Sequence, residues 1–541
     1  MTRSVRLRPW QKAALERFAA HPHPDFLAMA TPGAGKTTFA LTAAISRMAA
    51  PDGPRRLVVV APTAHLKRQW ATAATRFGVH LDDQWSAGSP LPTDMHGIVT
   101  TYQQVAVSAP QLAVAARGAM VVFDEIHHAG DERTWGETVR TAFAAAACRL
   151  SLSGTPFRSD TRSIPFLRYE LDEARPDFEY GYGDALRDGR VVRPVYFPRT
   201  NGQMEWSAPD GSTWSASFDD ALDTVRANQR LRTALSLEGD WLPTVLRTAH
   251  DRLTDIRRTH PDAGGLVVAT DQDHARAIAD ALSWRHGVQA VVATSDDAGA
   301  SDRIAAYAAS DVPWLVAVRM VSEGVDIPRL RVGVYATTTT TELFFRQAVG
   351  RLVRWTTGVP SQRSYLYIPD DARLRGFAYR IAETRRHSLR RDTQARPEAD
   401  PAELDALREA PVRDEEQLSL FAVISAVATD VDDPAHEPLP ADADHDDSGG
   451  EELLLTLPAL AGPAPPEAGA GGVVLTRREQ KARLRDRNAA LARDLARRTG
   501  WPHARVNAEL NRLAGLRRIQ DATVEQLQRR LRQAEAWHAR L

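Results

Sequence analysis

A glycine-rich loop, placed between an apolar run and a run of helix-forming residues, limits the folds that this chain can adopt. Residues 26–40 read FLAMATPGAGKTTFA. A strand, a glycine loop and a helix in this order form a phosphate-binding loop, because the glycines let successive backbone N–H groups turn toward the phosphates. The lysine reaches the β- and γ-phosphates, and the threonine hydroxyl binds Mg²⁺. The sequence therefore predicts an α/β domain that binds ATP and Mg²⁺ through Thr31, Gly33, Ala34, Gly35, Lys36, Thr37 and Thr38.

The lysine of this loop stands out from the composition of the chain. Of 68 basic residues only 4 are lysine, a bias typical of a GC-rich bacterial genome. Arginine carries a planar fork of donors, whereas lysine is a compact point charge. A lysine at position 36 therefore indicates a site where a guanidinium does not fit.

Length and composition set broad limits on the class of protein. A chain of 541 residues is long enough for about three or four structural units. Its 43% hydrophobic and 25% charged content is typical of soluble globular proteins, and no apolar run approaches the ~20 residues of a membrane span. The N-terminus lacks the apolar core of a signal peptide, so we expect a cytoplasmic protein. The single cysteine, Cys148, excludes an internal disulfide framework and a cysteine-rich zinc site.

Charge is distributed unevenly along the chain. Residues 396–472 carry 3 basic and 19 acidic side chains, whereas residues 476–541 carry 17 basic and 7 acidic ones. The acidic stretch is rich in Pro, Ala, Gly and Asp and buries too little apolar surface to offset its ordering entropy. We therefore expect a largely disordered linker over 396–475. Two apolar runs inside it, LSLFAVISAVA and LLLTLPAL, could dock on a neighbouring domain, and the sequence leaves their partner open.

The basic segment after the linker has a different pattern. Its leucines recur at helical spacings, and the run is broken at TGWPH, which predicts a small bundle of about three helices over 476–541. Its positive charge is consistent with a second DNA-binding surface or with an ordinary solvated face that pairs with the acidic linker. The Glu479-Gln480-Lys481 sequence in it resembles the end of a nuclease motif, but no catalytic strand precedes it, and we expect no nuclease.

An acidic pair later in the first half predicts a second part of the nucleotide site. Strand-like and helical stretches alternate here, as in a parallel α/β sheet, and AMVVFDEIHHAG places Asp124 and Glu125 directly after a buried strand. At this position a P-loop enzyme uses Asp to hold Mg²⁺ and Glu to activate the attacking water. A solvated strand end is the alternative for an isolated acidic pair, but the P-loop upstream favours the catalytic interpretation.

The ordered set of motifs resembles a superfamily 2 helicase or translocase of the DEAD/DEAH-box type. The motifs are TPGAGKTT, APTAHLKRQW, TTYQQ, DEIH, SGTPFR, EGVDIP and QAVGRLVR, and they extend over residues 5–370. GTPFRSD and VSEGVDIPRL resemble the branch of XPB-like motors and ResIII-type restriction-enzyme motor subunits. The resemblance implies two tandem RecA-like domains with parallel sheets, over 1–185 and 186–395, the second with a hairpin and helical insert at 200–260.

The resemblance also implies roles for single residues. Gln11 in LRPWQ is expected to read adenine, and Gly324 and Asp326 to link the nucleotide site to a nucleic-acid strand. The arginines of QAVGRLVR share a helix face and are expected to reach the γ-phosphate from the second domain. The remaining expectations are catalysis by Gln347, Arg351 and Arg354, coupling between the domains by His127, Ser153 and Thr155, and nucleic-acid contacts by Thr63, Thr100 and Thr101.

Two further features have structural alternatives. His127 and His128 are adjacent and point in opposite directions at a strand end, so they do not predict a metal site. Residues 201–218 predict a hairpin, which is either a pin that splits strands or, more simply, an edge hairpin of the second domain.

These observations together predict an ATP hydrolase that moves on, or remodels, DNA. We expect duplex or forked DNA as the partner, bound largely without regard to sequence because phosphates rather than bases are contacted. Two alternatives remain open, namely an RNA-directed remodeller and a nucleic-acid-sensing ATPase of a defence or restriction complex that gates a separate effector. Defence or repair proteins would then be further partners.

Overall fold

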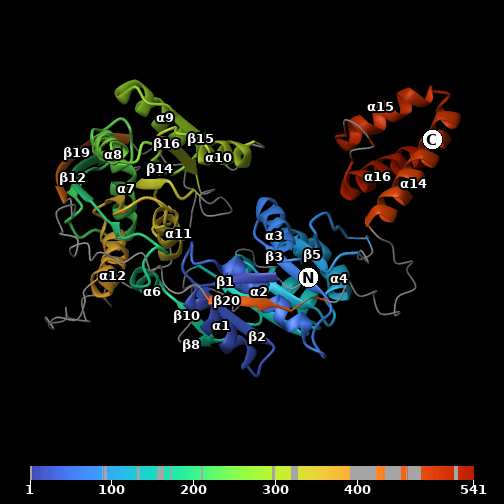
Figure 1. The fold of residues 1–541 in the computed structure, drawn as a ribbon. Helices are drawn as coiled ribbons and strands as arrows, with labels where there is room; N and C mark the ends of the chain where they lie inside the picture. Colours follow the sequence, from blue (N-terminus) through green and yellow to red (C-terminus); the bar gives the residue numbers. More distant parts are fainter. Residues whose placement is uncertain are drawn as a thin grey trace.

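The computed structural model contains two parallel-sheet α/β domains and a C-terminal helical bundle (Figure 1). None of the helices in its described ranges combines the length and the apolar composition that a membrane span requires. The residues that the structure describes are 3–87, 89, 94–130, 135–154, 164–170, 173–208, 211–294, 299–318, 327–389, 422–432, 453–458, 460, 477–516, 519 and 522–540.

The first domain is built on a seven-stranded sheet in the order β10-β2-β7-β6-β3-β5-β4, and all its neighbouring strands are parallel. Helices of the first domain cover both faces, so successive strand residues pack on opposite sides. Val59 of β3 packs in the core that includes α2, whereas Val58 and Val60 pack in the core that includes α4 and α5. The strands are β2 (Asp25–Ala30), β3 (Leu57–Ala61), β4 (Leu81–Asp82), β5 (Gly97–Thr101), β6 (Met120–Phe123), β7 (Cys148–Ser153) and β10 (Phe178–Tyr180).

The helices of this domain follow its strands in chain order. They are α1 (Pro9–Ala19), α2 (Lys36–Ala49), α3 (Ala64–Arg76), α4 (Tyr102–Ala115), the 3-10 helix η1 (Ile126–Gly130) and α5 (Trp135–Phe143). A short strand pair, β8 (Tyr169–Glu170) and β9 (Glu173–Ala174), lies apart from the main sheet. Since the strands are parallel, the loops after β2, β3, β5, β6 and β7 all lie at one edge of the sheet, where the expected motifs meet.

The second domain contains a nine-stranded sheet whose central order is β12-β18-β17-β14-β16-β15. β12 (Arg199–Ser207) and β13 (Thr213–Ser217) form an antiparallel hairpin at the place where the sequence predicts one, and Trp206 lies opposite Trp214 in it. The remaining strands are β11 (Val195–Tyr196), β14 (Gly264–Ala269), β15 (Ala290–Ala293), β16 (Trp314–Val318), β17 (Leu330–Ala336), β18 (Ser364–Pro369) and β19 (Ala422–Asp432).

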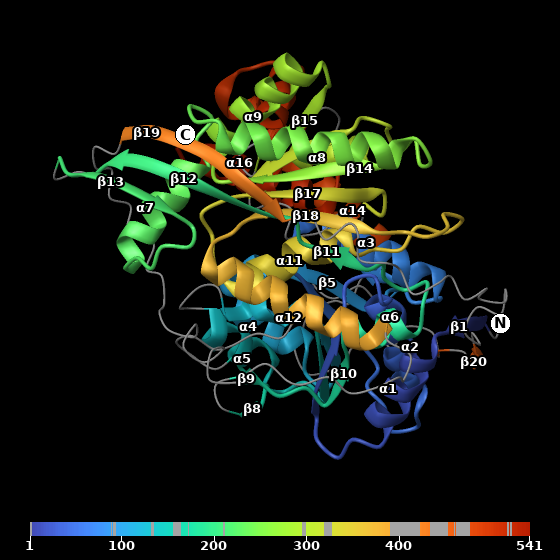
Figure 2. The same cartoon turned by 90° about the vertical axis from the view of Figure 1, so that its left-hand side faces the viewer.

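Helices of the second domain also join it to the first. Helices α7 (Thr224–Ala234), α8 (Trp241–Arg257) and α9 (Gln272–His286) share a separate buried core on one face of its sheet. On the other face, α10 (Ala300–Ala308), α11 (Glu342–Leu352) and α12 (Ala372–Leu389) belong to the buried cluster that also includes α1 and α2. Figure 2 shows α11 and α12 between the two sheets. The short helix α6 (Tyr182–Arg187) begins the connector between the domains.

Part of the acidic segment is ordered on the two α/β domains. β19 pairs antiparallel with β12 of the second domain, and Ala426 at its centre is buried and accepts a hydrogen bond from the N–H of Asp240. β20 (Leu453–Leu457) pairs antiparallel with β1 (Arg3–Leu7), which precedes α1 of the first domain. These two strands overlap the two apolar runs for which the sequence leaves docking on a neighbouring domain open, and backbone pairing holds them there. The rest of residues 396–475 lies almost entirely outside the described residues.

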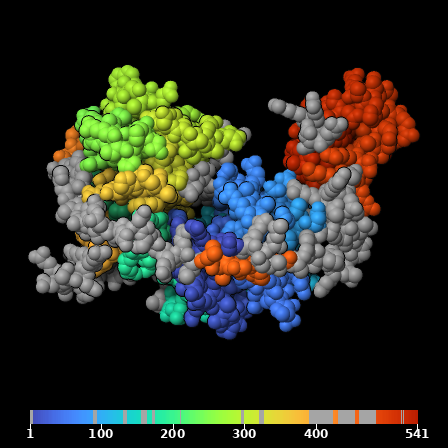
Figure 3. Space-filling view, viewed as in Figure 1, coloured from blue at the N-terminus to red at the C-terminus, as the bar shows by residue number. Residues whose placement is uncertain are grey.

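The C-terminal bundle consists of α14 (Arg477–Thr499), α15 (His503–Ala514) and α16 (Val524–Arg540). Leu495, Leu510 and Leu527 of the predicted leucine series are fully buried. Figure 3 shows the bundle, in red, to one side of the first domain. The side chain of Gln528 contacts Ser86 and Ser89, which follow β4 of the first domain, and it donates to Ser89 Oγ at 2.6 Å.

We expect the docking of β20 to depend on Leu457, which is only 3% exposed. Leu457→Asp places a carboxylate in this core and should release β20, with a loss of about 2–4 kcal/mol in the stability of the first domain. Leu454→Asp is the matched control, because Leu454 lies on the same strand but is 68% exposed. Thermal unfolding and hydrogen exchange of the β1 amides are the measurements. Equal protection of β1 in the two variants would show that β20 does not hold it.

Candidate nucleotide site between the two sheets

The phosphate loop lies between β2 and α2 and has the geometry of an anion site. Gly33 and Gly35 have φ angles of +82° and +93°, which residues with a side chain rarely adopt. Lys36 is the first residue of α2, so the unpaired N–H groups and the positive end of the helix dipole face the loop. The N–H of Thr31 donates to the carbonyl of Tyr180 at 3.0 Å, which ties the loop to β10. Thr37 and Thr38 follow in the first turn of α2 and are half-buried.

Residues at the start of α1 hold this loop from outside. Gln11 Nε2 donates to the carbonyl of Gly35 at 3.0 Å, and Trp10 Nε1 donates to that of Ala34 at 3.1 Å. The Arg8 guanidinium donates to the carbonyls of Gly33 and Ala34. Adenine reading by Gln11 stays a prediction, but the buried Gln11 amide also fixes the loop. Sequence reasoning missed Arg8 and Trp10, although both lie in the LRPWQ motif.

The acidic pair follows β6, and its second member is paired with the P-loop lysine. Lys36 Nζ lies 2.7 Å from Glu125 Oε1, and the N–H of Gly154 donates to Glu125 Oε2 at 2.9 Å. Burial alone would raise the pKa of Glu125, but Lys36 and His127 outweigh it and lower this pKa to about 2. A Cβ on Gly154 would lie 2.8 Å from Lys36 Nζ, so a side chain there would push the lysine ammonium aside. Glu125 is therefore a charged carboxylate held at the mouth of the loop.

Asp124 is more deeply buried than Glu125 and has a different environment. Its Oδ2 accepts a hydrogen bond from Trp70 Nε1 at 2.8 Å. Burial, together with the neighbouring charge of Glu125, raises the pKa of Asp124 to about 6. A cation beside Asp124 would offset both effects, so this carboxylate fits the expected role of a Mg²⁺ ligand opposite Thr37 at the start of α2. The arrangement can thus hold phosphates at α2 and a divalent cation beside them.

Helix α11 of the second domain completes the site from the opposite side. Gln347 Nε2 lies 3.2 Å from His127 Nε2, and His127 Nδ1 lies 3.4 Å from Ser153 Oγ, so a polar chain links the two sheets. Gly350 lies against Pro32, since a Cβ on Gly350 would be 2.7 Å from Pro32 Cγ. These contacts place α11 directly over the phosphate loop.

Two arginines are expected to reach the γ-phosphate from the second domain as arginine fingers, and both lie at the end of this helix. Arg351 belongs to its last turn, and Arg354 follows its C-terminus. A Cβ on Gly33 would lie 3.8 Å from Arg354 Cγ, so Arg354 borders the loop itself. Thr155, Gly324 and Asp326 lie outside the described residues.

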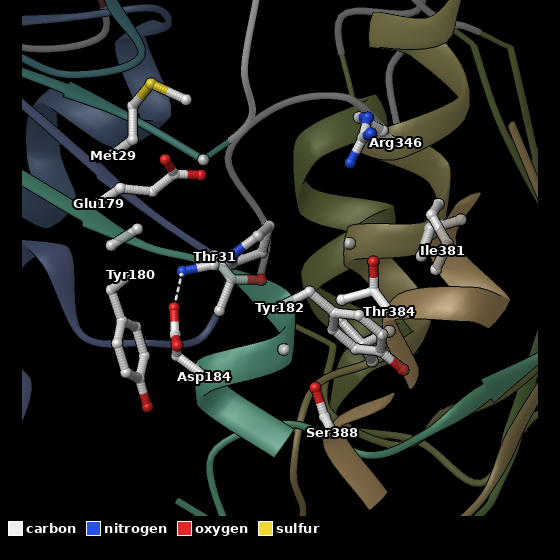
Figure 4. A pocket seen from close by; sticks show the side chains of 18 of the residues that line it. Met29, Thr31, Glu179, Tyr180, Tyr182, Asp184, Arg346, Ile381, Thr384 and Ser388 are labelled. Carbon is white, nitrogen blue, oxygen red and sulfur yellow. Dashed lines mark hydrogen bonds between the residues drawn. The ribbon is translucent and has the colours of Figure 1, made fainter. Parts of the chain in front are cut away.

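A cavity of about 530 Å³ opens beside the loop, between the two domains (Figure 4). Four residues of the phosphate-loop region also line this cavity, namely Thr31, Pro32, Gly154 and Gly350. Figure 4 shows side chains of α6, α11 and α12 around it. No motif in the sequence indicated the other side chains of this wall, which include Glu179, Tyr180, Tyr182, Asp184, Arg346, Thr384 and Ser388.

The expected nucleic-acid residues lie at the ends of two neighbouring strands. Thr63 caps α3 by accepting from the N–H of Leu66, and Thr101 caps α4 by accepting from the N–H of Gln104. The two helix N-termini at this edge can attract phosphates. Thr100 is fully buried and donates its hydroxyl to Gln104 Oε1 at 3.0 Å. The expectation that the Thr100 side chain contacts nucleic acid therefore needs correction, because this side chain is turned inward.

Comparison with known proteins shows a family similarity over the first domain. Residues 4–158 match the family model described as "Type III restriction enzyme, res subunit". An uncharacterized protein of Mycobacterium tuberculosis is 44% identical to this chain over 394 residues, which cover 71% of the chain and 65% of the relative. The chain thus matches somewhat less than two thirds of this relative's length.

Two solved structures are similar in fold at low identity. The type ISP restriction-modification enzyme LlaBIII bound to DNA is 16% identical, with a TM-score of 0.44 over 67% of this chain and 27% of that one. Dbp5 of S. cerevisiae bound to RNA and ADP BeF3 is 13% identical, with a TM-score of 0.44 over 70% of this chain and 87% of that one.

The site generates a prediction for the Lys36–Glu125 pair. Lys36→Ala removes a phosphate contact, so ATP binding and turnover should both be lost. Glu125→Gln keeps the shape and the phosphate contacts but removes the base, so ATP should bind and persist while turnover falls by roughly 10²–10⁴-fold. Nucleotide binding and single-turnover hydrolysis measure the two effects separately. Normal turnover by Glu125→Gln would refute the water-activating role.

Proposed function

We propose that this protein is an ATP-dependent motor that moves on, or remodels, DNA. The observation that carries the proposal is the contact of α11 with the phosphate loop. Pro32, Lys36 and Glu125 belong to the first domain, whereas Gln347, Gly350 and Arg354 belong to the second domain. A nucleotide bound at α2 would touch both domains, so its hydrolysis would change how they fit together.

Each group near the loop has a defined task in this proposal. Lys36 and the N–H groups of α2 hold the phosphates, and Glu125 accepts the proton of the attacking water. Thr37 and Asp124 would hold Mg²⁺, which supplies charge neutralisation at the phosphates. Arg351 and Arg354 stabilise the charge that develops on the γ-phosphate. The proton that Glu125 accepts weakens its pairing with Lys36, which prepares the site for product release.

The nucleic-acid strand is proposed to lie across the capped N-termini of α3 and α4. Thr63 and Thr101 fix these helix ends, and backbone N–H groups there bind phosphates rather than bases. Such contacts give binding that is indifferent to sequence and sensitive to salt. Opening and closing between the sheets would then shift the strand relative to one domain at a time.

The test of the proposed function is ATP hydrolysis in the presence of different nucleic acids. We expect duplex or forked DNA of unrelated sequences to stimulate turnover equally, and RNA of the same length to stimulate it less. Arg354→Ala serves as the control for site-specific hydrolysis. Stronger stimulation by RNA would replace DNA by RNA as the substrate, and the absence of stimulation by either nucleic acid would refute the motor.

The C-terminal bundle should increase the affinity for DNA. The first 395 residues carry 48 basic and 43 acidic side chains, so most of the excess positive charge lies in residues 476–541. Deleting 476–541 should weaken DNA binding and reduce the slope of log affinity against log salt by about 0.9 for each phosphate that the bundle would otherwise neutralise. Turnover saturated with DNA should change little.

A linker variant distinguishes DNA binding from charge pairing inside the chain. The acidic run ADADHDD lies between β19 and β20, so replacing its four Asp by Asn leaves both docked strands in place. If the acidic linker covers the bundle, this variant should bind DNA more tightly than the unaltered chain. An unchanged salt slope after deletion of 476–541 would show that the bundle is a docking element or a solvated face.

A further inference from the structure

The connector between the two domains passes beside both the phosphate loop and the expected finger Arg354. Val191 O and Arg354 Cγ both lie 3.8 Å from the position that a Cβ on Gly33 would occupy. Val192 forms an isolated antiparallel bridge with Arg354, and the N–H of Arg193 donates to the carbonyl of Val353 at 2.7 Å. The connector therefore touches both halves of the nucleotide site.

The side chain of Arg193 joins the segment after α11 to the segment that precedes β17. It is fully buried, and its guanidinium donates to the carbonyls of Arg354, of Pro328 at 2.5 Å and of Leu330 at 3.3 Å. It also donates to Thr356 Oγ1 at 3.0 Å. Pro328 ends the EGVDIP motif. One planar group thus binds the backbone after α11 and the backbone before β17 together.

The surroundings of the Arg193 guanidinium disfavour its positive charge. Burial, together with the positive charge of nearby Arg331, lowers the pKa of Arg193 to about 8. The oxygens that Arg193 contacts in the described structure are carbonyls and a hydroxyl, so no carboxylate among those contacts balances its charge. The carbonyls at the C-terminal end of α11 carry partial negative charge, which stabilises the guanidinium. Its fork can bind several carbonyls at fixed angles, which an ammonium cannot do.

We infer that Arg193 is a positioning residue for ATP hydrolysis, which holds the backbone of Arg354 at a fixed place relative to the phosphate loop. The inference rests on the proposed function, since it assigns Arg193 to the finger that function requires. Without Arg193, the segment after α11 keeps the hydrogen bond from Thr356 Oγ1 to the carbonyl of Pro328 but loses the guanidinium that joins the carbonyl of Arg354 itself to Pro328. Arg354 would then still be present but would reach the γ-phosphate less often. Misplacement of about 1 Å can lower turnover about 100-fold.

A second buried arginine of the same domain offers a matched control. Arg329 is 7% exposed, and its guanidinium donates to the carbonyls of Asp262, Tyr307 and Val312 at 2.8–2.9 Å. Arg329 stands between Pro328 and Leu330 in the chain, but its side chain contacts the segment before β14, the helix α10 and the turn before β16. Arg329→Met and Arg193→Met therefore remove equivalent buried contacts from the same domain, and only the second affects the finger.

The experiment compares the two variants at temperatures well below their unfolding midpoints. Arg193→Met should lower kcat about 100-fold with ATP affinity changed less than about threefold, and Arg193→Lys should recover only part of kcat. Arg329→Met should lower the unfolding midpoint as well but keep kcat within about threefold. ADP with aluminium fluoride, which mimics the transition state, should bind Arg193→Met weakly, whereas ADP alone should bind normally. Normal kcat in folded Arg193→Met would overturn the inference.

A double variant separates positioning from a general structural effect. If Arg193 acts through Arg354, then Arg193→Met combined with Arg354→Ala should be no slower than Arg354→Ala alone. Multiplicative losses would show that Arg193 acts independently, against the inference. A folded Arg354→Ala variant with normal turnover would instead contradict the proposed function, because the finger itself would then be dispensable.

Discussion

Gly350 and Pro32 approach so closely that a methyl group would not fit between them. This contact lets a helix of the second sheet lie on the phosphate loop of the first, and the remaining features of the site depend on it. It brings Gln347 within hydrogen-bond distance of His127 and places Arg354 beside Gly33. A bulkier residue at 350 would separate the two halves. The close approach of the Gly350 backbone to the Pro32 ring is therefore the constraint that makes one site from two domains.

Buried charged side chains have different partners in the two domains. In the first, Lys36 and Glu125 neutralise each other, while Asp124 keeps a raised pKa until a cation joins it. In the second, Arg193 is surrounded by carbonyl oxygens. Removing one partner of a buried charged contact is strongly destabilising, so these groups hold defined positions. The first arrangement places charged side chains at the phosphate loop. The second joins the backbone after α11 to the backbone before β17.

The acidic segment shows how composition and local pattern compete. Its overall charge predicts disorder, yet Ala426 and Leu457 are buried on the two α/β domains. Strand addition satisfies backbone groups that a sheet edge would otherwise leave exposed. β20 also supports β1, which leads directly into the Arg8–Gln11 segment that holds the phosphate loop. Residues more than 400 positions apart in the chain thus support the same site.

The sequence by itself determined the parallel α/β class, the phosphate loop and the acidic pair, because each depends on residues that are neighbours in the chain. A strand, a glycine turn and a helix with Lys36 at its start can be recognised without a fold. Only the tertiary structure decided that Thr100 turns inward, that Arg8 and Trp10 hold the loop, and that Arg193 joins Pro328 to Arg354. These contacts link segments far apart in the chain, and an ordinary buried arginine has no local pattern that distinguishes it from a surface one.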